Sequence, residues 1–378
     1  MSTAKRIHTL DGFRGIFALM IIIDHAANDS FIFQNFIVQK ADYFVDYFFV
    51  LSGFVISYNY LHKIKDFASF KDFMVRRLIR LYPLLLYTTL LFFGLMLIGK
   101  HWNTFNDPYP VLFLQLTDTL TLMNSNPIFG SSLGINYPSW SISSEMISYA
   151  LFGCCLFMFR RNAVMVLSLF LLGAGLFILY TGKYMYMGDF GFVRGLFCFI
   201  LGYLVHLLSQ KVNPRFGTLP ELLFLFLLLL VFKYLPSDGA ILLPFVFALG
   251  IFIFVSGKGI ITSFLETKPA QFLGKISYSV YLNHAIVVLI LKKLFFDLLG
   301  LDQSKISINI AYLLISVAST LGYSYFTNRY IETGIGDLLK QRFYRGTKKV
   351  SYSYAATPSY RNKKPGSITG DKSESPGS

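Results

Sequence analysis

The sequence predicts an all-α protein of the polytopic membrane class, a helix bundle with about ten transmembrane helices. The first observation is composition: 54% of the 378 residues are hydrophobic and 14% are charged, whereas an average soluble domain is about 25% charged. The second is that apolar segments of about twenty residues, the length that crosses a bilayer as a helix, recur along the chain. The third is that Lys and Arg cluster at alternate ends of these segments, as the positive-inside rule requires.

Ten segments are predicted as transmembrane helices. In chain order they are residues 12–30, 43–61, 78–98, 138–159, 162–181, 189–208, 219–235, 241–257, 274–292 and 308–328. With ten spans, 25 of the 34 Lys and Arg residues share the side of the two termini and seven lie on the other side. Because basic residues are enriched in cytoplasmic loops, we expect both termini in the cytoplasm. The membrane is then the plasma membrane, which is the inner membrane if the cell is Gram-negative.

An eleventh apolar stretch, residues 110–124, is interpreted as non-spanning or re-entrant. It carries Gln115, Thr117, Asp118 and Thr119 at its centre, and polar groups at membrane depth are tolerated where they line a cavity instead of facing lipid. If this stretch crossed the membrane, every later segment would be inverted. The basic clusters would then no longer share one side.

The chain divides into a membrane domain, residues 1–335, and a basic tail, residues 336–378. From about Gly346 the tail is rich in Ser, Pro, Gly and Lys. Such a composition cannot bury enough apolar surface to order itself, so we expect a disordered cytoplasmic tail. The formal charge of +14 is accounted for by the positive-inside asymmetry and by contact with anionic membrane lipid, and we expect no nucleic-acid partner.

The first predicted span carries two ionisable residues, Arg14 and His25. Eleven residues at about 1.5 Å each place them about 16 Å apart along the helix axis. Arg14 can therefore stand at the cytoplasmic mouth while the His25 imidazole lies near mid-bilayer. An ionisable group in a membrane helix costs about 2.5–3.5 kcal/mol on insertion scales and usually faces the bundle interior to serve a function. This pattern predicts a buried reaction centre with a charged entrance.

Two later spans bury further ionisable groups. Glu145 lies one to two turns inside the membrane, and a buried carboxylate needs a partner. His284 lies nine residues beyond the basic residue Lys275, about 14 Å deeper. We therefore expect His25, His284 and Glu145 to converge in the middle or outer half of the bilayer.

The partner of His25 is expected to be Glu145 or Tyr281. Asp24 is adjacent to His25 in the sequence, and neighbouring residues on a helix point about 100° apart. Asp24 is therefore predicted to be a poor orienter of the imidazole.

Arg77 and Arg80 stand where the third span begins. Three residues apart, they share a helix face and could clamp phosphates. Basic residues at a cytoplasmic helix end are also expected with no ligand at all, so both interpretations stay open on the residues alone. Arg194, a cation inside the sixth span, is expected to counter Glu145 or Asp189.

Six motifs occur in a fixed order. They are Leu10-Asp11-Gly12-Phe13-Arg14-Gly15 followed by His25; Tyr47-Phe48-Phe49-Val50-Leu51-Ser52-Gly53-Phe54; Arg77-Leu78-Ile79-Arg80-Leu81-Tyr82-Pro83; Trp140-Ser141-Ile142-Ser143-Ser144-Glu145; Gly274 to His284; and Tyr325-Phe326 with Glu332. Over about residues 6–332 the chain thus resembles the acyltransferase 3 family of integral-membrane acyltransferases. The family often has paired glutamates after the tryptophan, whereas here Ser144 precedes a single Glu145. The resemblance is to the stand-alone form, as in O-antigen and exopolysaccharide O-acetyltransferases, because 378 residues leave no room for the extracytoplasmic hydrolase-like domain of longer members.

The resemblance implies a polysaccharide-modifying O-acyltransferase that moves an acyl group, acetyl from acetyl-CoA in the simplest case, to a hydroxyl of a glycan or lipid-linked sugar. The residues it assigns are His25, Glu145 and His284 for catalysis and Arg14, Arg77 and Arg80 for the acyl-CoA. His25 would be the general base or a transient acyl carrier. Acyl transfer needs a base, a site for an anionic cofactor and donors for the oxyanion, and these residue types supply all three. The chain has no metal-ligand spacing, and we expect no metal.

The competing interpretation is a transporter or flippase for a polar or lipid-linked glycan, because buried His, Glu and Arg side chains also build proton relays. It does not account for Arg77 and Arg80 beside Arg14 at one mouth. The chain also shows no convincing inverted repeat of the kind that many carriers have. A purely structural membrane protein would not need so many buried ionisable groups, so the residues favour an enzyme.

Overall fold

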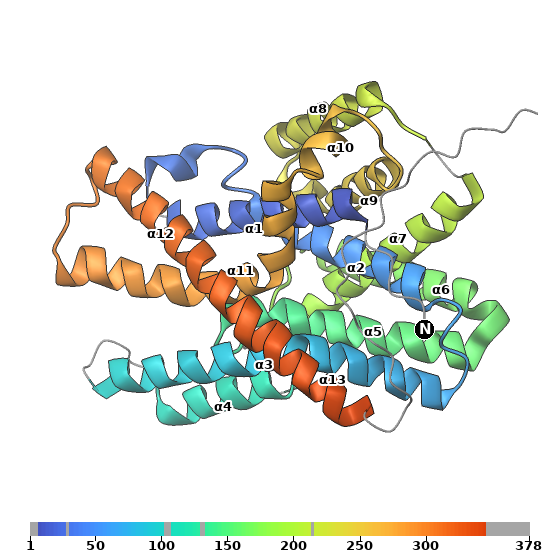
Figure 1. The fold of residues 1–378 in the computed structure, drawn as a ribbon, viewed down its shortest axis with the longest axis horizontal. Helices are drawn as coiled ribbons and strands as arrows, with labels where there is room; N and C mark the ends of the chain where they lie inside the picture. Colours follow the sequence, from blue (N-terminus) through green and yellow to red (C-terminus); the bar gives the residue numbers. More distant parts are fainter. Residues whose placement is uncertain (1–6, 28–29, 102–106, 129–132, 213–214, 345–378) are drawn as a thin grey trace, which may run out of the picture.

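The computed structural model describes residues 7–27, 30–101, 107–128, 133–212 and 215–344, and within these ranges the chain is helical and forms no strand. The helices, shown in Figure 1, are α1 (His8–Ala27), α2 (Phe44–Tyr60), α3 (Phe67–His101), α4 (Tyr109–Leu120), α5 (Trp140–Phe159), α6 (Ala163–Thr181), α7 (Gly191–Val212), α8 (Thr218–Tyr234), α9 (Leu243–Phe254), α10 (Ile260–Leu265), α11 (Lys268–Lys292), α12 (Ile306–Thr327) and α13 (Gly336–Tyr344). The predicted all-α membrane helix bundle is confirmed.

Each of the ten predicted spans contains a helix. Within the described residues, the helical segments long and apolar enough to cross a membrane are Phe67–His101, Tyr137–Thr181, Gly191–Val212, Ser237–Phe254, Lys268–Leu298 and Ile306–Tyr344. One of these six segments holds both α5 and α6, joined by a short turn. The number of helices that cross the bilayer therefore stays a prediction.

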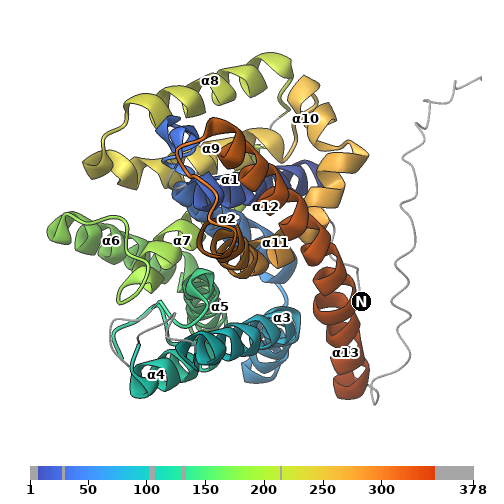
Figure 2. The same ribbon diagram turned by 90° about the vertical axis from the view of Figure 1, so that its left-hand side faces the viewer.

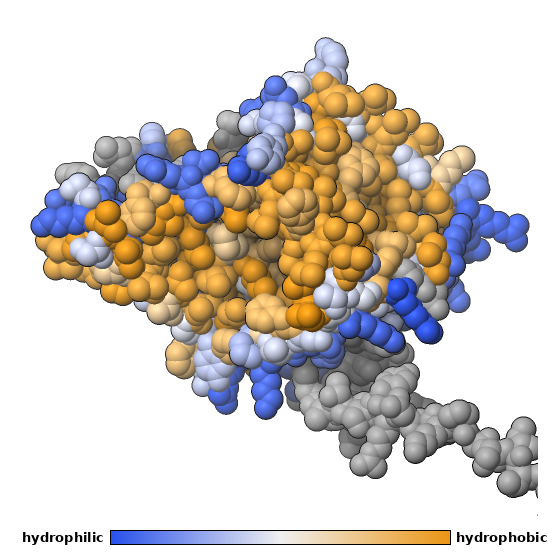
Figure 3. Space-filling view, turned by 90° about the horizontal axis from the view of Figure 1, so that it is seen from above, coloured by the Kyte–Doolittle hydropathy of each residue, from blue (hydrophilic) through white to orange (hydrophobic). Residues whose placement is uncertain are grey.

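The surface agrees with a membrane environment. Figure 3 shows a broad hydrophobic surface with hydrophilic residues gathered at its edges. Large apolar side chains such as Leu172 and Leu176 on α6, and Leu223 and Phe226 on α8, are more than half exposed. Contiguous apolar surface of this extent is what lipid tails cover in a membrane protein.

The stretch predicted not to span, residues 110–124, forms α4 and the turn after it. Twelve residues make a helix about 18 Å long, shorter than the roughly 30 Å hydrocarbon core. The helix packs beside α3 (Figure 2). Its length supports the non-spanning interpretation.

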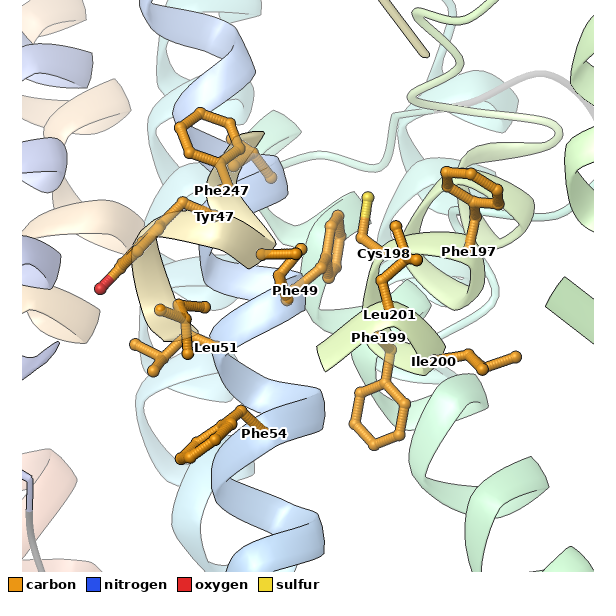
Figure 4. Close-up of a cluster of buried hydrophobic side chains, with 14 of the residues drawn as sticks. Tyr47, Phe49, Leu51, Phe54, Phe197, Cys198, Phe199, Ile200, Leu201 and Phe247 are labelled. Carbon is orange, nitrogen blue, oxygen red and sulfur yellow. The ribbon is translucent and has the colours of Figure 1, made fainter. Parts of the chain in front are cut away.

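Two helix pairs form the centre of the bundle, α1 with α11 and α2 with α7. A Cβ atom at Gly15 would overlap the backbone of Gly274 on the facing helix, and a Cβ atom at Gly53 or Gly202 would overlap a facing backbone carbonyl. Small residues let membrane helices approach this closely. Between α2 and α7 the space is filled by buried side chains that include Phe49, Phe54 and Phe199 (Figure 4). The glycine of the first motif thus brings α1 against α11, where the candidate site lies.

Part of the predicted tail is ordered. Residues 336–344 form α13, which packs against α3. The Tyr344 hydroxyl donates to Asp72 Oδ1 at 2.6 Å, and the Arg76 guanidinium lies over the Tyr344 ring at 4.4 Å. Helical structure therefore continues past residue 335. The remainder of the predicted tail, residues 345–378, lies outside the described residues.

Candidate active site

Two histidines from neighbouring helices meet inside the bundle. His25 lies near the end of α1 and His284 lies in α11, and their ring centroids are 4.8 Å apart in an edge-to-face arrangement. His284 is 1% exposed, whereas His25 is only partly buried. The close packing of α1 on α11 at Gly15 and Gly274 allows this meeting.

Each imidazole is oriented by a backbone carbonyl of its own helix. His25 Nδ1 lies 3.0 Å from the Ile21 oxygen, and His284 Nδ1 lies 2.6 Å from the Tyr281 oxygen. Because a carbonyl oxygen only accepts, we assign the proton of each neutral ring to Nδ1. Both Nε2 atoms then keep a lone pair and can take a proton from a hydroxyl.

Two carboxylates lie beside His25. Asp24 Oδ2 is 3.5 Å from His25 Nδ1, and one potential ligand atom from each of Asp24, His25 and Asp42 lies within 4.8 Å of the others. The His25 side chain turns back toward the Ile21 carbonyl, which orients the ring, and so comes near Asp24; that Asp24 is a poor orienter of the imidazole stays a prediction. Carboxylates so placed stabilise the imidazolium that forms when His25 takes a proton.

The same three side chains are of types found in metal sites. Since both carboxylates lie beside the His25 ring, we assign them to it.

Tyr137 completes the group and was not predicted from the sequence. Its ring stacks on His25 with centroids 5.4 Å apart, and its hydroxyl lies 3.5 Å from His284 Nε2. Asn136 anchors this turn, because its amide donates to Thr88 of α3 at 3.1 Å and to a backbone carbonyl of α11 at 3.3 Å. No local pattern distinguishes Tyr137 from the 23 other tyrosines; only the packing of its turn between helices does.

A pocket of about 370 Å³, its open mouth included, adjoins the histidine pair. It is lined by His25, Ala26, Ser30, Lys292, Phe296, Gln303, Asn309 and Tyr312. His25 faces this space and His284 is not part of its lining. A hydroxyl that enters the pocket would therefore meet His25.

Glu145 does not join the histidines. Its carboxylate accepts hydrogen bonds from Ser52 Oγ at 2.5 Å and from the Tyr149 hydroxyl. Within the described part of the chain, no hydrogen bond or ion pair links it to either histidine. Tyr149 in turn packs on Phe73, the ring that the Arg77 guanidinium overlies. Glu145 thus belongs to the surroundings of the arginines, and its chemical role stays a prediction.

Arg80 is held by a carboxylate from the far end of the chain. It forms an ion pair with Glu332, which is 2% exposed. The other Glu332 oxygen accepts from Ser279 Oγ at 2.7 Å and from Asn328 Nδ2 at 2.8 Å. Much of the Arg80 charge is therefore already compensated within the protein.

Arg77 has a different environment. Its Nη2 donates to the Tyr60 hydroxyl at 2.8 Å and its guanidinium lies over the rings of Tyr60 and Phe73. Its buried Nε has no hydrogen-bond partner, and no carboxylate pairs with it among the residues that the structure describes. Its neighbour Arg76, by contrast, pairs with Asp72 at 2.8 Å. Of these arginines, Arg77 is best placed to bind an added anion.

Arg14 lies in the first half of α1, with Nη1 3.2 Å from Asp11 Oδ1 and about 30% of its side chain exposed. The structure does not place it in an ion pair with the groups around Arg77. Its predicted part in binding an acyl-CoA stays a prediction.

Arg194 pairs with Asp46 of α2, not with the predicted Glu145 or Asp189. Its Nε lies 2.7 Å from Asp46 Oδ1, and both side chains are fully buried. The earlier expectation was wrong because the depth of a residue does not tell which helix lies beside it. Arg194 also donates to the backbone carbonyl of Asp42 at 3.4 Å, so the ion pair supports the segment that carries Asp42.

Comparisons with known proteins agree with this arrangement. The model of the acyltransferase 3 family, described as an acyltransferase domain, matches residues 7–329. The chain is also similar to "Protein 2 in picA locus" of Rhizobium radiobacter, with 29% identity over 163 residues that cover 40% of this chain and 83% of that protein. No solved structure matches the chain.

Proposed function

This chain belongs to the acyltransferase 3 family of membrane acyltransferases, and we propose that it is an O-acyltransferase that moves an acetyl group from acetyl-CoA to a hydroxyl of a glycan or lipid-linked sugar. Another acyl-CoA could serve as donor by the same chemistry. The observation that carries the proposal is His25, a partly buried imidazole that turns Nδ1 to the Ile21 carbonyl and lies beside a pocket and two carboxylates.

In the proposed reaction, the acceptor hydroxyl gives its proton to His25 Nε2 while its oxygen attacks the thioester carbonyl carbon. Asp24 and Asp42 stabilise the imidazolium. The Tyr137 hydroxyl, 3.5 Å from His284 Nε2, would turn its proton from that nitrogen to the oxyanion. The C–S bond then breaks, and the CoA thiolate takes the proton back from His25, so an ester and a free thiol are the products.

His25 could instead act as a transient acyl carrier. Its Nε2 would attack the thioester, CoA thiolate would leave, and the acceptor oxygen would then attack the acyl-imidazole. His284, whose Nε2 keeps a lone pair that faces the Tyr137 hydroxyl, would serve as the base for the second step. The two routes share the same residues and differ in whether an acyl-protein can be trapped.

We propose that the donor binds at the arginines. CoA carries several phosphate charges, and Arg77 offers a guanidinium without a carboxylate partner among the described residues. Arg14 would support the same mouth. Arg80 would contribute less charge, because Glu332 already pairs with it. Glu145, which accepts from Ser52 and Tyr149 near the arginines, would line the donor site.

The proposed orientation has the arginine end and both termini in the cytoplasm, where acyl-CoA is made, and the histidine end toward the outside. Reporters fused after Ser209 and at the C-terminus should then read cytoplasmic, while reporters near Lys183 and near Asp297 should read extracytoplasmic. An extracytoplasmic C-terminus would contradict this orientation.

The test of the function is release of CoA thiol by the purified protein in lipid vesicles. With labelled acetyl-CoA and a surface-glycan fraction from cells lacking the gene, we expect free thiol and labelled glycan to appear together. A carrier would bind or move the glycan without releasing thiol, and that result would contradict the proposal. Mass spectrometry of surface glycans with and without the gene would then identify the group and the acceptor.

A further inference from the structure

The pocket beside His25 is built from three parts of the chain. Ser30 follows α1, Lys292 and Phe296 lie at the end of α11 and in the π-helical turn after it, and Asn309 and Tyr312 belong to α12. The turn between α11 and α12 therefore forms one wall, and the end of α1 forms the other. A molecule in this space lies against His25 and against residues that the reaction itself does not use.

The aromatic part of the wall is fixed. Tyr312 is 4% exposed, and its hydroxyl donates to the Val288 carbonyl at 3.2 Å. The ring of Phe296 packs on the ring of Tyr312 with centroids 5.1 Å apart. A preformed aromatic surface next to a few placed polar groups is typical of small-molecule sites, and it suits the C–H face of a sugar ring.

The polar side chains of the wall include both hydrogen-bond donors and hydrogen-bond acceptors. The Asn309 amide nitrogen donates to the Gln303 carbonyl at 2.8 Å, so its Oδ1 remains to accept a hydrogen bond from a ligand hydroxyl. His25 Nε2 is a second acceptor, by the tautomer assigned above. Gln303 and Lys292 add donors, and the Ser30 hydroxyl, which donates to the Ala27 carbonyl at 2.8 Å, can accept. Donors and acceptors interleaved around an aromatic surface match a polyhydroxylated ring.

The size of the pocket limits how much of a glycan can enter. The 370 Å³ includes open solvent at the mouth, and the space open to the centres of water-sized spheres is only about 50 Å³, enough for about four waters at about 10–15 Å³ each. So small a pocket holds no more than one sugar ring, and any further ring of a glycan would lie outside its mouth.

We propose that this pocket is the acceptor subsite and that it takes a single sugar ring, presented as a chain end or as a lipid-linked unit, and not a stretch of polymer. This inference rests on the proposed function. It assigns acceptor recognition to the turn between α11 and α12, with Asn309 as a specificity-determining residue.

The first arm of the test is a chain-length series. Acetyl transfer from acetyl-CoA by the wild-type protein in vesicles is measured to methyl glycosides of glucose, galactose, rhamnose and N-acetylglucosamine, and to the matching di- and trisaccharides. For the sugar that is accepted, we expect the acceptor KM to change less than about threefold beyond the first ring. A KM that falls about tenfold with each added ring, equal to about 1.4 kcal/mol per ring, would overturn the single-ring subsite.

The second arm uses Asn309→Leu, which keeps the side-chain size and removes both the accepting oxygen and the amide that donates to the Gln303 carbonyl; Asn309→Asp, which loses the amide but keeps an accepting oxygen, is measured beside it to separate the two losses. We expect the acceptor KM to rise about tenfold, the loss of about one hydrogen bond, with the KM for acetyl-CoA unchanged. Ser307→Ala, on the exposed first turn of α12 and outside the pocket, is the matched control. An unchanged acceptor KM in Asn309→Leu would overturn the assignment of the pocket.

The two failures can be told apart. If the wild-type protein transfers acetyl groups but its acceptor KM falls about tenfold with each added ring, the single-ring subsite is wrong and the proposed function stands. If no acetyl group leaves acetyl-CoA for any glycan, the proposed function is wrong, and the acceptor subsite falls with it.

Discussion

The histidine pair and the arginine cluster lie at different depths of one bundle and are held in different ways. Tyr278 of α11 donates to the Leu81 carbonyl, one residue from Arg80, whereas His284 lies six residues, about 9 Å, farther along α11. Each histidine is oriented by a carbonyl of its own helix. Arg80, by contrast, is held by Glu332, which is 252 residues away in the sequence. Hydrogen bonds within one helix therefore orient each histidine, whereas contacts between distant segments determine which arginine is paired with a carboxylate.

The largest effect is expected at His25, if the histidine end is where the chemistry occurs. His25→Ala should lower acyl transfer at least about 100-fold, because general-base catalysis contributes about 10²–10⁴-fold. The protein should still accumulate in the membrane, since the apolar helix is kept. Acylation is measured in cells beside membrane abundance. His206→Ala, which removes a buried histidine packed on Phe54 and Tyr58, is the control. Wild-type acylation by a well-expressed His25→Ala would remove His25 from the mechanism.

The second prediction separates the arginines. Arg77→Ala should raise the acetyl-CoA KM about tenfold or more, because it removes a charge-assisted contact worth about 1.5–3 kcal/mol. The loss should be larger at low salt than at high salt, and Arg77→Lys should restore binding only in part. Arg80→Ala should change the acetyl-CoA KM less, since its charge is shared with Glu332. Equal effects of the two alanine variants on the acetyl-CoA KM would contradict the proposal that Arg77 contributes more to donor binding than Arg80.

The third prediction concerns the carboxylate beside His25. Asp24→Asn keeps the shape of the side chain and removes the charge near the imidazole, so kcat should fall by about tenfold, equal to about 1.4 kcal/mol of lost imidazolium stabilisation. The acetyl-CoA KM should stay the same, because Asp24 lies at the histidine end. Asp238→Asn, on an exposed turn before α9, is the comparison and should leave both constants unchanged. A change in the donor KM without a change in kcat would contradict the assignment of Asp24.

The fourth prediction tests Glu332 as a structural group. Breaking a buried ion pair costs about 3–5 kcal/mol, and because the Arg80 side chain is 40% exposed we expect about 1–3 kcal/mol for Glu332→Gln. The melting temperature of the protein in detergent should fall. Arg80→Met combined with Glu332→Met should recover part of the loss, because neither charge is then left alone. Full stability of Glu332→Gln would show that the ion pair does not hold the π-helical segment Asn328–Ile335, which follows α12, on α3.

The smallest effect is expected in the tail. A chain that ends after Tyr344 should retain activity within about twofold, because it keeps the contacts of Tyr344 with Asp72 and Arg76. Each such contact at the surface stabilises the protein by at most about 1 kcal/mol. A chain that ends after Ile335 loses both contacts and should have a higher acetyl-CoA KM. The two truncations are compared at equal membrane abundance. Loss of activity on ending at Tyr344 would place a functional element beyond the described residues.

Several features of the fold and site follow from the sequence. Composition and the length of the apolar segments predict the helices, and each predicted span contains one. Because every helical residue advances about 1.5 Å, the sequence also predicts how deep a residue lies along its own helix. That is why Arg14 and His25 could be assigned to opposite halves of α1, and why His25 and His284 could be expected to meet.

Tertiary structure decided which side chains face each other at a given depth. The Glu145 carboxylate accepts hydrogen bonds from Ser52 and Tyr149 and, in the described part of the chain, contacts neither histidine in this way. Tyr137, which lies in a turn without a recognisable motif, contacts both histidines. Axial position depends only on the count of residues in a helix. The rotation of a helix and the choice of its neighbours depend on how whole side-chain surfaces pack, such as glycine against a facing backbone, and that information is spread over residues hundreds of positions apart.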